Sequence, residues 1–515
     1  MSPARTTSVY LFFFVFSLYA LSFSTALSNR GIGEGHVKIA VLQSLVDNGS
    51  IGLDAPLTHT VPGRGGKYYT YHEFGQNVFV LPIFLLAKGL RDTGFPFFLA
   101  NAVLTALTCV LLCRMLILCG FSSASSLATA LLYGVATPAW FYGAKAPFEQ
   151  PVVAFLLLAA FYCMFRHGKG EGHSITNVVL GSVCAGMGLI TRTDMVLALP
   201  VLALFVWLLK KEAGGERIDP KKTAAVFMAV LLPFVAFALC YNYLRFGSVW
   251  QTGYQLDIRE QMFKPAYFPF GAAGFLVSPG KSIFLFAPVL LLLPFAMRAF
   301  YRKVPRSLFV ALSAQVMLYF FFFSSFVVWH GDWCWGPRFF LVVTPFLVMP
   351  LAALLENWRN MGGAKKLAIT VLIVVSVAVQ LLPVLSNFYL GLAAKYGLHV
   401  PENPRLWRDF GPLDSLSYWR SFFVPRYSAI FTQAGILIDS VRSFFSYDYF
   451  TQLAWRLPSS DTPQLFIVRD LYGIDLWWLQ LRSGPGYAAA AVLMLIGGFS
   501  GWEIARSVGK GKNPT

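Results

Sequence analysis

Long apolar segments separated by short polar connections recur along most of this sequence, and they constrain its fold more than any other feature. Of the 515 residues, 57% are hydrophobic and only 13% are charged. Soluble domains carry about twice that share of charged residues. Because an apolar helix of about 20 residues crosses a bilayer, the sequence predicts an all-α polytopic membrane protein with outer loops and juxtamembrane helices.

About twelve segments are long and apolar enough to be expected as transmembrane helices. A further apolar segment, Asn77–Leu90, is too short to span and is expected to be a juxtamembrane or re-entrant helix. A signal peptide cut after Ala26 is the alternative for the first segment. The expected spans lie near Ser8–Leu27, Pro96–Leu118, Ala124–Tyr142, Pro151–Phe165, Ile175–Ile190, Met195–Leu209, Thr223–Tyr243, Ser282–Ala296, Leu308–Val328, Phe339–Leu355, Leu367–Leu385 and Tyr487–Ser500.

Lysine and arginine are concentrated in alternate connections, which fixes the expected orientation. Since cytoplasmic loops carry the excess of these residues, both termini are predicted to be cytoplasmic. Treating Asn77–Leu90 as a span would place every later cluster outside. The same bias accounts for the net charge of +17, so nucleic acid is not an expected partner. The clusters are Arg166/Lys169, Lys210/Lys211/Arg217/Lys221/Lys222, Arg298/Arg302/Lys303/Arg306, Arg359/Lys365/Lys366 and Arg506/Lys510/Lys512.

This topology divides the chain into three predicted regions. Residues 1–385 form a transmembrane module whose first outer loop is 28–95, residues 386–486 form an outer region on the membrane surface, and residues 487–515 hold the last span and a cytoplasmic tail. Of the seven cysteines, only Cys334 lies in an expected outer loop. Neither a disulfide framework nor a metal-ligand spacing follows from that distribution.

Two glutamates at the outer ends of helices are the candidate catalytic residues. Glu34 stands between two glycines at the expected start of a helix, and Glu149 precedes a helix that begins with Pro151. Two carboxylates in one outer cavity could deprotonate an acceptor and orient a donor. The alternative for both is a capping carboxylate in the first turn of a helix.

Further polar residues share the expected outer face and are candidates for binding an anionic substrate. The forked guanidinium group of arginine suits phosphate, although arginine near a membrane surface often only contacts lipid headgroups. Signatures of soluble nucleotide-binding, serine-nucleophile and zinc enzymes are missing from the sequence. The candidates are Lys67, Tyr69, His72, Arg192, Asp194, Arg245, His330, Asp332 and Arg338.

These features together resemble the GT-C membrane glycosyltransferases, in particular the bacterial group of aminoarabinose transferases and protein O-mannosyltransferases. Glu34 stands where that family has its first acid, usually an aspartate or an Asp-Glu pair, whereas this chain has a single glutamate. Glu149 matches the family's second outer acid. The loop that runs from Lys67 to Gly75 resembles the one before the family's short outer helix. Further similar stretches are Leu189–Arg192, Arg245–Gly247, Ser278–Lys281 and Gly336–Phe339.

The resemblance implies transfer of a sugar from a polyprenyl-phosphate carrier to a hydroxyl of a lipid, glycan or protein, at the periplasmic face of the bacterial inner membrane. It also implies inversion at the anomeric carbon, with Glu34 as general base; a divalent metal is compatible with the wider fold. A transporter or flippase for a lipid-linked saccharide is the alternative. The position of the ionisable residues at the ends of spans, without an internal repeat, favours the enzyme.

Overall fold

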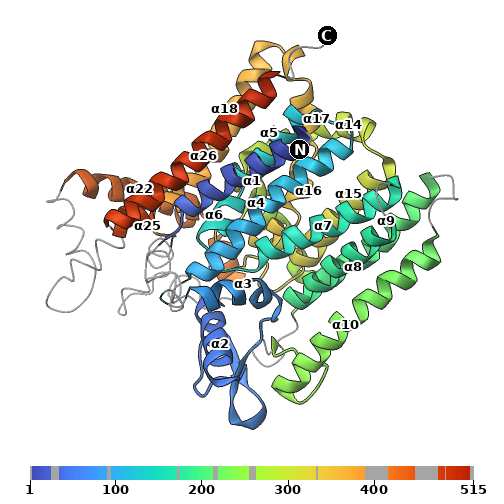
Figure 1. Ribbon diagram of the computed structural model, residues 1–515. Helices are drawn as coiled ribbons and strands as arrows, with labels where there is room; N and C mark the ends of the chain where they lie inside the picture. Colours follow the sequence, from blue (N-terminus) through green and yellow to red (C-terminus); the bar gives the residue numbers. More distant parts are fainter. Residues whose placement is uncertain are drawn as a thin grey trace.

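The computed structural model describes residues 3–24, 34–87, 89, 94–170, 174–212, 219–254, 262–331, 334–388, 416–446, 474–481 and 483–510. Most of these residues are helical, and β1 (Thr60–Pro62) and β2 (Tyr68–Thr70) form a short antiparallel hairpin. Figure 1 shows the helices gathered in one bundle, with α2 projecting from its lower end.

The α-helices differ widely in length, from single turns to helices of 27 residues. They are α1 (Pro3–Leu21), α2 (Glu34–Asn48), α3 (Gly75–Leu86), α4 (Phe95–Leu118), α5 (Ser123–Val135), α6 (Ala139–Ala144), α7 (Gln150–Lys169), α8 (Ser174–Thr191), α9 (Ala198–Glu212), α10 (Pro220–Phe246), α12 (Phe268–Val277), α13 (Ile283–Phe286), α14 (Leu293–Lys303), α15 (Arg306–Ser324), α16 (Thr344–Val348), α17 (Leu351–Glu356), α18 (Gly363–Leu385), α21 (Leu416–Ser421), α22 (Ala429–Phe445), α25 (Trp477–Leu481) and α26 (Gly484–Lys510). Short 3-10 helices are η2 (Arg64–Gly66), η4 (Thr193–Leu197), η5 (Pro265–Tyr267), η6 (Pro288–Leu292), η7 (Arg338–Val342), η8 (Trp358–Asn360) and η9 (Pro425–Tyr427).

Among the described residues, seven helices are long and apolar enough to cross a membrane, and further apolar helices are shorter. The prediction of an all-helical polytopic membrane protein is therefore confirmed. The short apolar segment after the first loop forms α3, whose 12 residues extend about 18 Å. That is well short of the roughly 30 Å of a bilayer core, as expected for a non-spanning helix.

Three predicted spans are not continuous helices, and this corrects the sequence analysis. Residues 124–142 are divided between α5 and α6, with Pro138 as the N-cap of α6. Residues 282–296 and 339–355 each combine short helices with a 3-10 segment. Proline stands at the start of η6, α14 and α16. Because proline lacks an N–H and disfavours helical backbone in the residue before it, apolar composition did not guarantee continuity.

The connections that carry the basic clusters meet at one end of the bundle. Glu356, at the end of α17, binds Lys303 at the end of α14, with 2.9 Å between Oε1 and Nζ. The same carboxylate accepts a hydrogen bond of 2.7 Å from the hydroxyl of Ser122, just before α5. Glu212, at the end of α9, accepts from the backbone N–H of Ser307 in α15 at 2.7 Å. These contacts involve the ends of five helices and tie together the basic connections after α9, α14 and α17.

The C-terminal helix completes the bundle by packing against the first one. Gly497 and Gly501 of α26 face Ser17 and Phe14 of α1, so the two helices are antiparallel neighbours (Figure 1). The segment before α26 is fixed by the indole N–H of Trp477, which donates to the carbonyl of Ala20 at 2.8 Å. The C-terminal segment therefore lies beside the C-terminal end of α1.

Candidate active site

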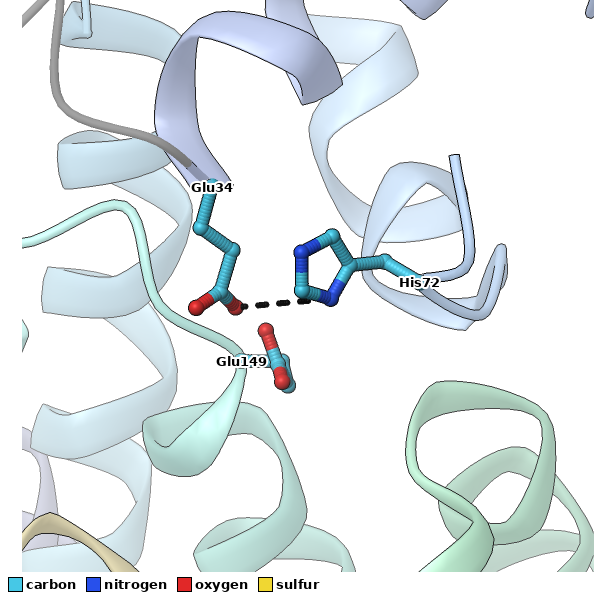
Figure 2. Close-up of side chains that lie close together, drawn as sticks. All are labelled: Glu34, His72 and Glu149. Atoms are coloured by element: carbon cyan, nitrogen blue, oxygen red, sulfur yellow. Dashed lines mark ion pairs between the residues drawn. The ribbon is translucent and has the colours of Figure 1, made fainter. Parts of the chain in front are cut away.

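Residues far apart in the sequence form a buried polar cluster at the end of the bundle opposite the basic connections. Glu34 begins α2, Glu149 stands immediately before α7, and His72 belongs to the loop between β2 and α3. Figure 2 shows their side chains pointing toward one another. The structure thus brings together both predicted catalytic acids and a predicted substrate-binding histidine.

Glu34 uses both carboxylate oxygens to bind cations. Its Oε1 accepts from the ammonium of Lys38 at 2.8 Å, and its Oε2 accepts from the guanidinium of Arg338 at 3.1 Å. Burial raises the pKa of Glu34, but the charges of Lys38 and Arg338 more than reverse this and hold the pKa well below its usual range. Glu34 is therefore ionised at neutral pH, and it is held by Lys38 of its own helix and by Arg338 of η7.

Lys38 lies at the centre of the cluster and was missed by the sequence analysis. Its ammonium contacts the carboxylates of Glu34 and Glu149, and it donates to Oε1 of Gln76 at 2.9 Å. Burial lowers the pKa of Lys38, whereas the two carboxylates raise it above the usual value. A signal was present, because Lys38 follows Glu34 by four residues on a helix and therefore shares its face.

Glu149 is held between Lys38 and Arg192. Its Oε1 accepts from Nη1 of Arg192 at 2.8 Å, and the Nε of Arg192 donates to Asp194 Oδ1, also at 2.8 Å. Glu149 is the N-cap residue of α7 but makes no side-chain capping hydrogen bond. The capping alternative for Glu149 is therefore wrong, since its carboxylate is an ion-pair partner.

Arg338 enters the cluster from η7 and is more exposed than the other charged groups. Its side chain is 20% exposed, against 6% for Glu34. The guanidinium carbon lies 4.9 Å from the ring centroid of Phe148 and 5.2 Å from that of Phe339. Its Nε is buried without a hydrogen-bond partner among the described residues. Arg338 therefore retains a free donor while it is oriented by Glu34 and two aromatic rings.

His72 is buried beside Glu34 without being bonded to it. The distance from its Nδ1 to Glu34 Oε1 is 4.0 Å, and neither ring nitrogen has a hydrogen-bond partner among the described residues. Burial, with the nearby positive charge of Lys38, lowers the pKa of His72 well below its usual value. The imidazole is therefore neutral at physiological pH.

Two amide side chains fix the loop that ends in Glu149. Asn101 of α4 donates to the carbonyls of Ala146 and Phe148, both at 2.9 Å. Gln76 donates to the carbonyl of Phe148 at 3.0 Å while it accepts from Lys38. Because both amides are buried, these bonds hold the position of Glu149 relative to α3 and α4.

A second buried ion pair anchors the other end of the same loop. The ammonium of Lys145 binds Asp475 Oδ2 at 2.8 Å, and each side chain is 2% exposed. Asp475 also accepts from Ser24 at 2.5 Å and from Gln480 at 3.1 Å. The loop that carries Glu149 is thus tied to the end of α1 and to the segment that precedes α26.

Four other predicted site residues do not bind the charged groups of the cluster. Arg245 is 2% exposed, and its guanidinium donates to the carbonyls of Thr70, at 2.5 Å, and His72, at 3.3 Å, so it supports the backbone of the histidine loop. Lys67 pairs with Asp54, and Tyr69 donates to the carbonyl of Arg64. The ring of His330 is buried and stacks on Phe422. Asp332 lies outside the described residues.

Glu34, His72 and Glu149 also form a group that could hold a metal ion, since one ligand atom from each lies within 4.8 Å of the others. The ammonium of Lys38 hydrogen-bonds to both of these carboxylates. A divalent cation at this position would be repelled by that charge and would compete for the same oxygens. The residues present therefore fit a site organised around a lysine better than one organised around a metal.

No protein-family model matches the sequence, and no curated protein matches it. Two crystal structures of ArnT from Cupriavidus metallidurans are similar to the chain. The apo structure has 15% sequence identity and a TM-score of 0.45, and the match covers 91% of this chain and 84% of that one. The structure bound to undecaprenyl phosphate has 12% identity and a TM-score of 0.43, covering 92% and 84%. At these values the likeness by itself assigns no function to the chain.

Proposed function

We propose that this protein is a membrane glycosyltransferase that moves a sugar from a polyprenyl-phosphate carrier to a hydroxyl acceptor. The observation that carries the proposal is the buried cluster of three carboxylates, three cations and a neutral imidazole at one end of a membrane bundle. It combines an ionised candidate base with donors suited to a phosphate. The acceptor is a lipid, glycan or protein.

In the proposed reaction, the acceptor oxygen attacks the anomeric carbon while its proton passes to Glu34. The bond between the anomeric carbon and the phosphate oxygen breaks, and polyprenyl phosphate leaves with the electron pair. A single displacement of this kind inverts the anomeric carbon. Fixed cations that face a developing negative charge supply a large part of catalysis in many enzymes, and Arg338, Arg192 and Lys38 are placed for this role.

Binding of the donor would also strengthen the base. Glu34 owes its low pKa to Lys38 and Arg338, and the phosphate of a donor would compete for both cations. As their hydrogen bonds shift toward the phosphate, the attraction that keeps Glu34 deprotonated weakens and its proton affinity rises. A carboxylate that is inert in the free enzyme thus becomes a base when the donor is bound.

Arg338→Ala is expected to weaken binding of undecaprenyl phosphate by about tenfold to a hundredfold, the equivalent of one charged hydrogen bond of about 1.5–3 kcal/mol. Arg338 is the most exposed cation of the cluster and has a buried donor to spare. The affinity can be measured by titrating the lipid into purified protein while following tryptophan fluorescence. Unchanged affinity would assign Arg338 to orienting Glu34 alone.

The site is proposed to face the periplasm, with both termini in the cytoplasm. The arrangement of the basic connections at the opposite end of the bundle supports this orientation. A cysteine at Asp54, whose side chain is 86% exposed, is expected to react with a membrane-impermeant maleimide added to intact spheroplasts. A cysteine at Gly363, which has open space around it, should react only after lysis. The reverse pattern would invert the topology.

The reaction itself can be tested without knowing the sugar. A deletion strain should accumulate its lipid-linked sugar, and mass spectrometry of the extracted lipids would identify it. Purified protein, added to this extract in detergent with membranes as the acceptor source, should discharge the sugar and release free polyprenyl phosphate. A flippase would leave the pool unchanged, because in detergent there is no barrier across which it could act.

A further inference from the structure

The imidazole of His72 has no hydrogen bond at either ring nitrogen, whereas each charged group of the cluster is paired through at least one of its polar atoms. Glu34, Lys38, Glu149 and Arg192 are hydrogen-bonded to one another or to neighbours. Both ring nitrogens of His72 are buried and lack a partner among the described residues. Buried polar groups in native proteins nearly always have a partner, so an exception calls for a missing ligand or water.

The position of the ring is fixed from its backbone outward. The N–H of His72 donates to the hydroxyl of Thr70 at 3.2 Å, and its carbonyl accepts from Arg245. The rings of Tyr71 and His59 lie 4.9 Å and 5.4 Å from the imidazole, centroid to centroid. Packing and backbone contacts therefore direct the ring toward Glu34, as Figure 2 shows, although no hydrogen bond joins the two.

The distance between His72 and Glu34 would let one oxygen atom, placed beside the pair, bridge the two side chains. Nδ1 and Oε1 are 4.0 Å apart, which is too far for a direct hydrogen bond. Two hydrogen bonds of about 2.8 Å that meet at a right angle on one oxygen span about 4 Å. A hydroxyl group can donate to a carboxylate and accept from a neutral imidazole at the same time.

We infer that His72 holds the acceptor's hydroxyl group against Glu34, and that this histidine is not a ligand of the donor's phosphate. Resting on the proposed function, this assigns the two substrates to different sides of Glu34. The phosphate lies toward Arg338, and the nucleophilic hydroxyl lies toward His72. The N–H of His72 aligns the hydroxyl oxygen while its proton points at Oε1 of Glu34.

The neutral state of the imidazole agrees with this division. An uncharged histidine offers one donor and one acceptor, which suits an alcohol, and it contributes no charge toward a phosphate. A protonated amine would not serve as the acceptor, because it has no lone pair and would lie next to the ammonium of Lys38. The acceptor group favoured by the geometry is therefore an alcohol hydroxyl.

The test separates acceptor handling from donor binding. His72→Phe removes both ring nitrogens but keeps a planar ring, and His72→Gln restores one donor and one acceptor. His72→Phe is expected to discharge the accumulated lipid-linked sugar about tenfold more slowly than the parent, the loss of one well-placed hydrogen bond. Its affinity for undecaprenyl phosphate should be unchanged, and His72→Gln should recover part of the rate. His36→Phe, a change at an exposed histidine of α2, serves as the control.

Each other result overturns the inference. A parental rate in His72→Phe would mean that a water molecule fills the gap. Weakened binding of undecaprenyl phosphate would make His72 a donor ligand, and bound metal that is present in the parent but lost in His72→Phe would make it a metal ligand. Thermal unfolding midpoints of both variants show whether a slow variant is simply unfolded. If His72→Phe does not fold, His72→Gln is compared with His72→Ala instead. A rate in folded His72→Gln that is no higher than in His72→Ala contradicts the role. Failure of the proposed function is distinct, because the parent itself would then neither bind the lipid nor discharge the sugar.

Discussion

Glu34→Gln is expected to lower the rate of sugar transfer by about 10²–10⁴-fold, because an amide cannot take up a proton at neutral pH. The substitution keeps the length of the side chain and one oxygen that can accept from Lys38 or Arg338. It replaces the other oxygen with a donor that faces a cation, so some loss of stability is also expected. The rate is measured as discharge of the accumulated lipid-linked sugar by equal amounts of folded protein.

Glu149→Gln is the matched control for this experiment. Glu149 also lies between two cations, Lys38 and Arg192, so both substitutions remove one buried negative charge from two positive partners. If Glu34 is the base, its variant should lose far more activity than the Glu149 variant at similar stability. Equal losses would show that the charge balance of the cluster is what matters. Activity of Glu34→Gln within about threefold of the parent, far short of the loss typical of a base, would rule out that role and favour the transporter.

The fold was predictable wherever length and apolar composition decide the outcome. The long spans, the short helix α3 and the start of α2 at Glu34 follow from local sequence. The interrupted spans did not, because a helix in a membrane can break where neighbouring segments satisfy the freed backbone groups. Whether such partners exist depends on tertiary contacts. The carbonyl of Phe286, for example, accepts from Gln380 of α18, 94 residues away.

The site was predictable only in part, for a related reason. The positive-inside rule assigns a residue to one side of the membrane, which correctly grouped Glu34, Glu149, Arg192 and Arg338. It gives no lateral position or depth, so Arg245 and His330 were grouped with them although they contact other elements. Lys38 was overlooked because it lies among apolar residues of α2. The pairing of Lys145 with Asp475 joins residues 330 positions apart and leaves no local signal.

Lys38→Met is expected to destabilise the protein by about 3–5 kcal/mol, the usual effect of removing one partner from a buried ion pair. The carboxylates of Glu34 and Glu149 would then face each other without the cation between them. In the parent, the pKa of Glu34 is lower in the folded protein than in the unfolded chain. This difference stabilises the fold at pH values above the unfolded-state pKa, and the stabilisation is lost as the pH falls through the folded-state pKa. The pKa of Lys38 is higher in the folded protein than in the unfolded chain. This difference stabilises the fold at pH values below the unfolded-state pKa of the lysine, and the stabilisation is lost as the pH rises through its folded-state pKa. Both contributions are therefore present around neutral pH, where thermal unfolding in detergent should show the effect.

Lys303→Met is the control, since it removes a lysine from a partly exposed ion pair at the opposite end of the bundle, where such pairs contribute about 0–1 kcal/mol.

Lys38→Met and Lys303→Met should differ in activity as well. Without Lys38, the pKa of Glu34 loses its largest lowering influence and rises relative to the parent, so the acid limb of the discharge rate should move to higher pH. Adding Glu149→Gln to Lys38→Met removes the repulsion between the carboxylates and should recover stability without recovering the rate, because a donor to the phosphate is still missing. If the double variant regained both, Lys38 would serve only to keep the two carboxylates apart.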